Sequence, residues 1–377
     1  MQTPKISVVL PVKETSLRLS ETLDSIIRQT LKDIQIICVN DGQADNSLDI
    51  VKEYAAKDDR IVLLDKPNGG YGHSMNAGMD AATGEYLGIM ETDDFLNLTM
   101  YEDLYTLAEQ HHLDTIRGSY YCYNRNENGD IYLQYTAIDG NRGWMDKVYE
   151  PGADLSCMRV QPYNRAGIYY LPFLREHHIR FNEMPGVAFK DDGFFWQVQI
   201  HARRAMLLNK PYYYRCWDKL NTPVKDTDDI WAAIREYDFI RSILAQDSAV
   251  WEKYHGYYWY LRSYNHEAAE SIIPLENKTE FITALSAEYR EALASQEMSR
   301  ELFTTNQWSR IQFIARCPED YIQKNAVNQK ALDDAKKEKE MLRAQLNLAL
   351  NAERWYVYLL RGLKKIIHFV KNFIRSK

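Results

Sequence analysis

Three carboxylates, Glu91, Asp93 and Asp94, stand close together directly after a short apolar run at 86–90. The run predicts a buried strand, and acids just past such a strand lie where open α/β sheets bind ligands. Adjacent acids repel one another, which favours a bound cation, and Mg²⁺ is usually held by one or two carboxylates plus substrate phosphates. The alternative is that Asp93 or Asp94 only caps a helix expected over 97–110.

The composition limits the class of protein. Apolar content of 45% and charged content of 26% over 377 residues are typical of globular chains. The net charge of −7 argues against a nucleic-acid partner, because phosphate binding needs a basic face. Five widely spaced cysteines without a C-x-x-C pair predict neither disulfides nor a zinc site. With no signal-peptide pattern and no apolar run near the roughly 20 residues that span a bilayer, we expect a cytoplasmic protein.

Strand-like and helix-like segments alternate over the first part of the chain. Strands are expected at 6–12, 34–39, 61–64 and 86–90, with a helix between each pair. This order predicts a mostly parallel sheet with right-handed crossovers. The turn Pro11-Val12-Lys13-Glu14 lacks G-x-G-x-x-G, and no P-loop motif occurs, so glycine-rich phosphate binding of either kind is not expected.

Beyond residue 110 the pattern loosens. Shorter strands are expected at 114–120, 131–136, 205–208 and 212–216. The segment 166–179 reads as mostly helical with a break at Pro172. From residue 230 onward every segment reads as helical.

The polar stretch 219–229 predicts a domain boundary. We divide the chain into an α/β domain over 1–220, a helical domain over 221–328 and a long helix or coiled coil over 329–377. Within the last part, 355–377 predicts a basic amphipathic helix that suits an anionic membrane surface. The alternative is a helix that forms a homo-oligomer and leaves its basic face in solvent.

Five short motifs follow one another along the chain: the opening strand and turn 6–14, Val39-Asn40-Asp41-Gly42, Asn68-Gly69-Gly70 with the segment through Asn76 to Tyr86, Glu91-Thr92-Asp93-Asp94, and Asp191-Asp192. Their order and spacing over 5–217 resemble the inverting glycosyltransferases of family 2, of the type that builds bacterial cell-surface polysaccharides. The resemblance implies a GT-A fold: a Rossmann-like, mostly parallel sheet flanked by helices. Here an all-helical C-terminal region would follow it.

The resemblance assigns the donor site. Asp94 is the expected ligand of a divalent metal, Mn²⁺ or Mg²⁺, and Asp93 would reach the ribose or the metal. Such a cation stabilises the charge that a leaving nucleoside diphosphate gains. Asp41 would contact the uracil of a UDP-sugar, although it could instead be a structural turn acid before Gly42. Further nucleotide contacts are expected from Pro11, Val12, Glu14, Asn68, Gly69, Gly70, Asn76 and Thr92. The alternative for Asn68-Gly69-Gly70 is a simple turn without a ligand.

The same resemblance places the general base at Asp192, with Asp191 as its companion. A neighbouring carboxylate and desolvation would raise the pKa of such a base, and either acid could also cap the helix that follows. Two departures stand out: Glu91 and Asp191 replace the family's usual Asp and Glu. The family's Gln-x-x-Arg-Trp motif of processive polymerases is missing, which favours a single transfer.

The leading hypothesis is therefore an enzyme that moves one sugar from a nucleotide-sugar to a glycan or lipid-linked acceptor. The basic tail would hold it at the inner face of the membrane. A nucleotidyltransferase is disfavoured, because 11–14 is not a basic, glycine-rich triphosphate loop. The other alternative is a catalytically inactive, nucleotide-binding scaffold of a glycan-assembly complex. The presence of both Asp94 and Asp192 argues against an inactive protein.

Overall fold

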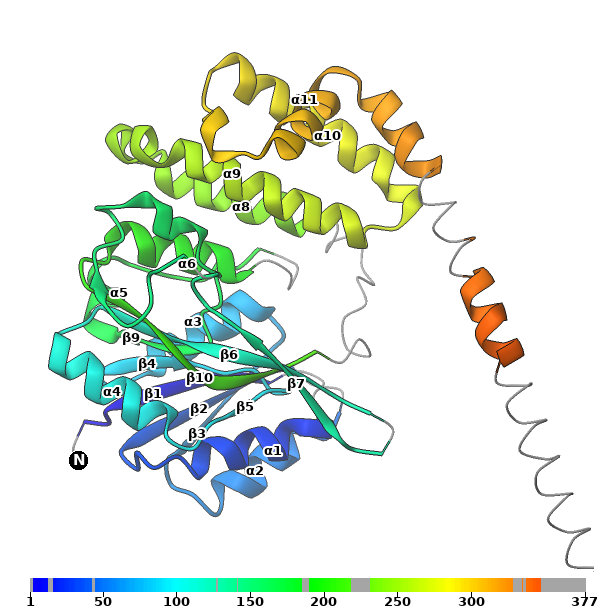
Figure 1. Cartoon of the computed structure of the whole chain (residues 1–377). Coiled ribbons are helices and arrows are strands. Elements are labelled where there is room, and N and C mark those ends of the chain that lie inside the picture. The colour runs from blue at the N-terminus through cyan, green and yellow to red at the C-terminus, as the bar shows by residue number, and fades with distance from the viewer. Residues whose placement is uncertain are drawn as a thin grey trace, which may run out of the picture.

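The computed structural model of the chain describes residues 3–12, 16–42, 45–126, 128–140, 142–184, 190–217, 231–327, 334 and 337–346. These residues form a sheet with helices on both faces and a layer of further helices on one side (Figure 1). Among them, no helix is both long and apolar enough to cross a lipid bilayer.

The first half of the sheet is wholly parallel. Its strands are β1 (Ile6–Val12), β2 (Ile34–Asp41), β3 (Ile61–Lys66) and β4 (Tyr86–Ile89), in the spatial order β3-β2-β1-β4. The crossover helices are α1 (Ser16–Ile27), α2 (Ser47–Ala55) and α3 (Tyr71–Ala81). All four predicted strands are confirmed, and their carboxyl ends meet at one edge, as parallel pairing requires.

The second half of the sheet is mixed. It continues from β4 through β9 (Gly167–Tyr170), β6 (Thr115–Arg125), β10 (Ala205–Cys216) and β5 (Phe95–Leu96). Two more strands pair at its margins, β7 (Ile131–Thr136) with β6 and β8 (Val148–Tyr149) with β10. Because β9 is antiparallel to both β4 and β6, it starts at the edge where β4 ends.

Two predictions in this half are wrong. The segment 166–179 is not mostly helical, since its first part is strand β9 and only Leu171–Glu176 forms helix α5. Pro172 lies in the first turn of α5, where its missing N–H costs nothing, so it begins the helix instead of breaking it. The two strands expected at 205–208 and 212–216 are one strand, β10, whose register shifts around Pro211.

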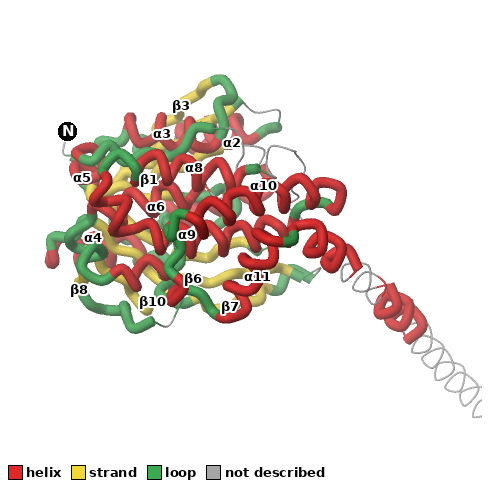
Figure 2. Tube along the Cα trace, turned by 90° about the horizontal axis from the view of Figure 1, so that it is seen from above, coloured by secondary structure: helices red, strands yellow, loops and turns green. Residues whose placement is uncertain are grey.

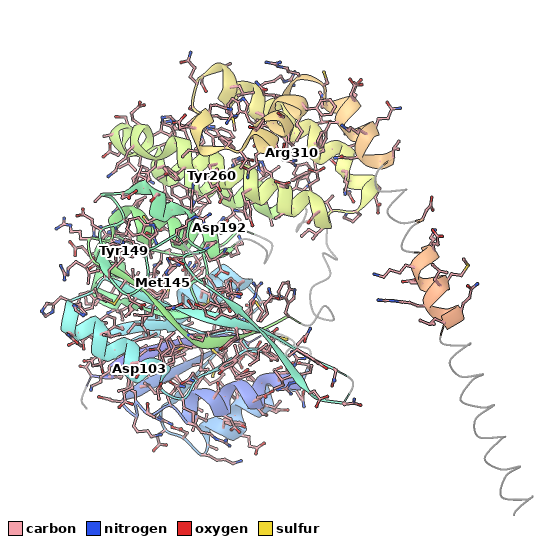
Figure 3. All side chains as sticks on the ribbon, in the orientation of Figure 1. Asp103, Met145, Tyr149, Asp192, Tyr260 and Arg310 are labelled. Carbon is pink, nitrogen blue, oxygen red and sulfur yellow. The ribbon has the colours of Figure 1, made fainter. Side chains whose placement is uncertain are left out.

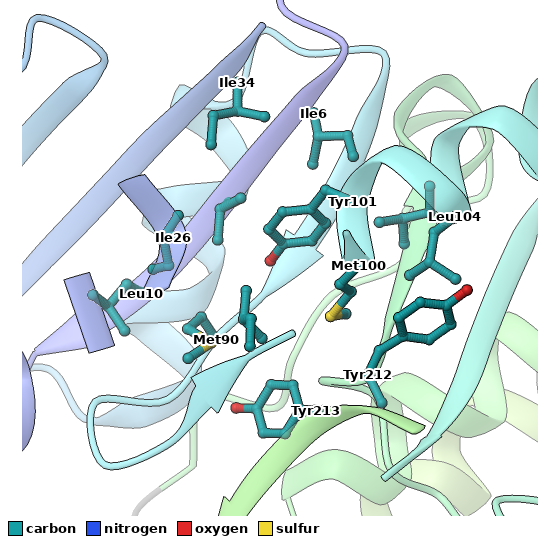
Figure 4. Close-up of a cluster of buried hydrophobic side chains, with 14 of the residues drawn as sticks. Ile6, Leu10, Ile26, Ile34, Met90, Met100, Tyr101, Leu104, Tyr212 and Tyr213 are labelled. Carbon is teal, nitrogen blue, oxygen red and sulfur yellow. The ribbon is translucent and has the colours of Figure 1, made fainter. Parts of the chain in front are cut away.

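Helices cover both faces of the sheet. One face carries α1, α2 and α4 (Met100–His111), and the other carries α3, α5 and α6 (Lys190–His201). Figure 4 shows the first core, in which Ile6 of β1 lies near Tyr101 of α4 and Leu10 of β1 lies near Ile26 of α1. Val9 of β1 belongs to the opposite core. Burial on both faces explains why these strands read as continuous apolar runs.

The helical region contains α8 (Ala232–Leu244), α9 (Ser248–Ile272), α10 (Leu275–Ala294), α11 (Thr305–Arg316) and the short turn η3 (Arg300–Leu302). The short turn η1 (Leu155–Arg159) of the sheet domain contacts α9. Viewed from above, α8 and α9 lie over α6 (Figure 2). One hydrophobic cluster joins Trp196 of α6 to Ile240 of α8 and Tyr258 of α9. The region therefore packs directly on the sheet domain.

Part of the predicted domain division falls on undescribed residues. The boundary stretch 219–229 and the basic tail 355–377 both lie outside the described residues, so the proposed domain limits stay predictions. Within the last predicted unit, 337–346 is helical, as expected.

The shared core predicts that α8 contributes to the stability of the whole fold. Ile240 is fully buried in this cluster, whereas Ile272 at the end of α9 is 50% exposed. We expect Ile240→Ala to lower the free energy of unfolding by about 2–5 kcal/mol, since it leaves a cavity. Ile272→Ala is the matched control and should change it by less than about 0.5 kcal/mol. Urea unfolding followed by circular dichroism measures both, and equal losses would contradict the shared core.

Candidate active site

The candidate site lies at the sheet edge where β1, β2 and β4 end. Asp41 is the last residue of β2, and Glu91-Thr92-Asp93-Asp94, here called the acidic turn, follows β4. Arg165 comes to the same edge because it precedes the antiparallel strand β9. The first turn of α6 adds Asp191 and Asp192.

Asp94 is the most enclosed acid of the turn. Its side chain is buried, with Oδ2 accepting a hydrogen bond from the Tyr213 hydroxyl (2.7 Å) and Oδ1 accepting one from the Cys216 backbone N–H (2.6 Å). Burial and then the charge of Asp93 raise the pKa of Asp94 to about 8, against the opposing effect of Arg165. Asp94 therefore fastens the acidic turn to the end of β10.

Asp93 is the open acid of the turn. Its backbone carbonyl accepts a hydrogen bond from the Tyr123 hydroxyl (2.7 Å), and its side chain is half-buried. Its carboxylate has no hydrogen bond or ion pair to any residue in the described part of the chain. Neither Asp93 nor Asp94 caps α4, whose N-cap is Thr99, so the capping alternative is wrong. Thr92 is buried, and its carbonyl accepts from the Thr22 hydroxyl (2.9 Å).

Arg165 joins the acidic turn to the acid pair of α6. Its Nε lies 3.1 Å from Glu91 Oε1, and its Nη2 donates to Asp191 Oδ2 at 2.9 Å. Glu91 also accepts a hydrogen bond from the Tyr71 hydroxyl (2.8 Å). Burial raises the pKa of Glu91, and the adjacent Arg165 acts against that rise. Glu91 is thus engaged by an arginine and a tyrosine.

The adjacent carboxylates of α6 face different surroundings. Asp191 forms an ion pair with Arg165, which in turn contacts Glu91 of the acidic turn. The Oδ1 atom of Asp191 is buried and has no hydrogen-bond partner among the described residues. Asp192 is only 5% exposed, and its Oδ2 accepts a hydrogen bond from Asn265 Nδ2 of α9 (2.6 Å). The same amide donates to the Tyr237 hydroxyl at 2.7 Å. Burial, then Glu236 and Asp191, raise the pKa of Asp192 well above its usual value.

Asp41 holds the glycine loop 68–70. Its Oδ1 accepts from the Gly69 N–H (2.8 Å), its Oδ2 accepts from the Gly70 N–H (3.1 Å), and Lys66 pairs with the same carboxylate. Burial acts to raise the pKa of Asp41, but the contacts from Lys66 and Gly69 bring it below the ordinary value. Gly42 has φ +67°, and a Cβ there would lie 2.8 Å from the Asn68 backbone nitrogen. Asp41 therefore holds the glycine loop in this structure, and its contact with uracil stays a prediction.

The other predicted nucleotide contacts divide into two groups. Pro11 and Val12 lie at the end of β1, next to the end of β2, and Glu14 is outside the described residues. Asn76 is buried in α3, where its Oδ1 accepts from the Phe181 N–H (2.9 Å) and its Nδ2 donates to the Phe181 carbonyl (3.0 Å). In this structure Asn76 positions the chain at Phe181, and its nucleotide contact stays a prediction.

Sequence reasoning missed the residues that hold the acids. Arg165 carried no signal, because it stands alone next to a segment predicted as helix. Asn265 lies in the helical region, far along the chain from any motif. The acids themselves pointed to this edge of the sheet, through their place after a predicted strand and through the family resemblance.

The residues of the site suit a metal ion that is bound jointly by the protein and by the phosphates of a nucleotide. Among the described residues, no group of three or more acidic, histidine or cysteine side chains is placed to hold a metal unaided. Mg²⁺ bound with phosphates needs only one or two carboxylates from the protein. The open Asp93 beside Asp94 fits that smaller requirement.

Comparison with known proteins agrees with the geometry. The family model "Glycosyl transferase family 2" matches residues 7–241, and the chain belongs to this family. The TarS 1–349 crystal structure from S. aureus, in complex with UDP-GlcNAc, superposes with a TM-score of 0.60 at 19% identity, over 79% of this chain and 82% of that one. The predicted GT-A fold, a mostly parallel mixed sheet flanked by helices and followed by a helical region, is confirmed.

Curated relatives match parts of the chain. The uncharacterized glycosyltransferase EpsJ of Bacillus subtilis (strain 168) is 39% identical over 118 residues, which is 31% of this chain and 34% of EpsJ. Glycosyltransferase GlyA of Streptococcus pneumoniae serotype 4 is 34% identical over 217 residues, 55% of this chain and 30% of GlyA. The chain thus spans about a third of the length of these relatives.

The bonds of Asp41 predict a pH-dependent stability. Asp41→Asn should lower the free energy of unfolding at pH 7 by about 1–3 kcal/mol, because the two glycine amides and Lys66 lose a charged acceptor. Since the folded pKa lies below the ordinary 3.8, this stabilisation is present above pH 3.8 and is lost as the pH falls through the folded value. Urea unfolding from pH 7 to pH 3 measures it.

The exposed Asp59 provides the control for this experiment. Asp59→Asn should leave the unfolding free energy near that of the unmodified chain at every pH. A gap between Asp41→Asn and the unmodified chain that grows as the pH falls would contradict the assignment.

Proposed function

We propose that this chain is a metal-dependent, inverting glycosyltransferase that moves one sugar from a nucleotide-sugar to an acceptor hydroxyl. A UDP-sugar is the proposed donor, and a glycan or lipid-linked glycan of cell-surface polysaccharide synthesis is the proposed acceptor. The observation that carries the proposal is that Arg165 links the acidic turn, through Glu91, to Asp191 of the acid pair on α6. Family membership and the likeness to TarS, whose structure contains UDP-GlcNAc, support it.

Asp93 and Asp94 are the proposed metal-binding pair. A divalent cation, Mn²⁺ or Mg²⁺, would neutralise the charge that the leaving diphosphate gains. Asp94 keeps the turn in place through Tyr213 and Cys216, which leaves the Asp93 carboxylate free to bind. The Asp41-held loop 68–70 would support the nucleotide from the neighbouring strand end.

Asp192 is the proposed general base. Inverting transfer needs a base that removes the acceptor proton on the side opposite the leaving group, and a raised pKa makes Asp192 a better proton acceptor. Asn265 holds one carboxylate oxygen, so the orientation of Asp192 depends on the helical region. Asp191 is paired with Arg165, and its buried Oδ1 remains available to a hydroxyl of the donor or acceptor.

Two proposals about the surroundings of the enzyme rest on the tail 355–377, which lies outside the described residues. We propose that the chain is cytoplasmic and that this basic segment binds the anionic inner face of the membrane. The same C-terminal helices are the proposed contact for a homo-oligomer.

Calorimetric titration with UDP, with and without Mn²⁺, tests the donor site. We expect metal-dependent binding that Asp93→Asn reduces to the metal-free level, because the open carboxylate is lost. Asp94→Asn should weaken the metal-dependent binding by at least about 10–100-fold, because it removes one proposed ligand and the acceptor that holds the turn to Tyr213 and Cys216. Asp59→Asn is the exposed control. The proposal would be contradicted if the unmodified chain bound UDP equally well with and without Mn²⁺ and if both variants bound UDP as well as the unmodified chain does.

Release of UDP from a panel of UDP-sugars tests the base. Asp192→Asn should lower kcat by about 10²–10⁴-fold and leave UDP binding unchanged. Asn265→Ala should keep part of the activity but shift the acidic limb of the pH profile upward, because the lost hydrogen bond had favoured the ionised form. An unshifted limb would assign Asn265 a structural role only. UDP binding without turnover of any sugar would instead support the inactive scaffold.

A further inference from the structure

A pocket beside Asp192 lies between the sheet domain and the helical region. Its volume is about 120 Å³, and its walls come from residues 158–162, α6, α8 and α9. Asp192 forms part of the wall, and Figure 3 shows it at the junction of the two regions, with Tyr260 of α9 above it. A molecule in this pocket would therefore approach Asp192 from the helical side.

The walls combine aromatic rings with positive charge. The aromatic lining residues are Phe195, Trp196, Tyr237, Tyr260 and Tyr264. The ring of Tyr264 is 56% exposed, which leaves a flat apolar surface of the kind on which sugar rings stack. The charged lining residues are Arg142, Arg159 and Asp192, so arginine outnumbers acid.

Arg159 is not neutralised by the protein. Its guanidinium lies 4.6 Å from the centre of the Tyr260 ring, and its Nη2 donates to the Leu302 carbonyl at 2.8 Å. Its Nε is buried and has no hydrogen-bond partner within the described residues. Arg262 and Arg310, elsewhere in the helical region, each pair with a glutamate instead. A partly buried guanidinium without an acid is a favourable place for a ligand anion.

Arg142 is the second unpaired guanidinium at this pocket. It is exposed, and its Nη1 donates to the Gly140 carbonyl at 3.1 Å. No carboxylate in the described part of the chain lies within salt-bridge distance of Arg142 or Arg159. Two such groups would also offset the repulsion between an anionic ligand and the carboxylate of Asp192.

We propose that this pocket is the acceptor site and that the acceptor carries an anionic group, a phosphate or a carboxylate, bound by Arg142 and Arg159. The inference rests on the proposed function, because it takes Asp192 as the base. In this arrangement the sugar or polyol of the acceptor stacks on Tyr260 and Tyr264. The anion lies against the two arginines, and the acceptor hydroxyl meets Asp192.

The test measures binding of small probes by saturation-transfer NMR to the full chain with UDP and Mg²⁺ present, because Mg²⁺ is diamagnetic and leaves the probe signals sharp. Glycerol 3-phosphate and methyl glucuronide are the anionic probes, and glycerol and methyl glucoside are their neutral counterparts. We expect at least one anionic probe to bind about ten-fold or more tightly than its counterpart, as a charge-assisted hydrogen bond predicts. The phosphate and carboxylate arms show which anion the pocket prefers.

Variants connect that preference to the pocket. Arg142→Gln, in an exposed side chain, should remove most of the anionic preference without affecting folding. Arg159→Gln should do the same, and Arg159→Lys, which keeps the charge, should retain part of it. Arg28→Gln, just after the end of α1, changes a side chain that is 70% exposed; it is the control and should change nothing.

The outcomes separate this inference from the proposed function. Anionic probes that bind no better than neutral ones, or a preference that both arginine variants retain, would overturn the anionic acceptor while UDP binding still supports the donor site. UDP that fails to bind would overturn the donor assignment, and calorimetry reports that separately in the same samples.

Discussion

The site depends on one guanidinium, that of Arg165, whose side chain is 18% exposed. Arg165 lies between Glu91 of the acidic turn and Asp191 of α6, and it joins two elements that approach the sheet edge from different parts of the chain. Without it, two half-buried carboxylates would lose the cation that they share. The bridge joins the turn that carries Asp93 to the helix that carries Asp192, while Tyr213 and Cys216 hold the turn and Asn265 holds Asp192.

Around Arg165 the acids differ according to their hydrogen bonds. Asp94 accepts from Tyr213 and Cys216, Asp41 accepts from the glycine loop, and Asp93 keeps an open carboxylate. The low dielectric constant of the protein interior strengthens each of these hydrogen bonds, and it raises the pKa of a buried acid that has no cation beside it. Three aspartates at one sheet edge therefore have different roles: Asp94 supports the acidic turn, Asp41 anchors the glycine loop, and Asp93 is open to a ligand.

The helical region belongs to the site as well as to the core. Trp196 of α6 packs in the same hydrophobic cluster as α8 and α9, so this layer sits close to the acid pair. That contact brings Asn265 to Asp192 and sets Tyr260 beside the pocket. A sheet domain without these helices would lack both the orienting amide and one wall of the pocket.

The strands of the first half and the acidic motifs could be predicted from the sequence, because apolar periodicity and short motifs are properties of neighbouring residues. The same local reasoning failed at 166–179, where the aromatic run before Pro172 forms a strand only by pairing with β4 and β6. Only the tertiary structure decided that Asp93 has an open carboxylate whereas that of Asp94 is hydrogen-bonded. It also decided that Arg165 and Asn265 are the residues that contact the acid pair. Asn265 and Asp192 are 73 positions apart, and no local pattern encodes a contact that exists only after the helical region packs on α6.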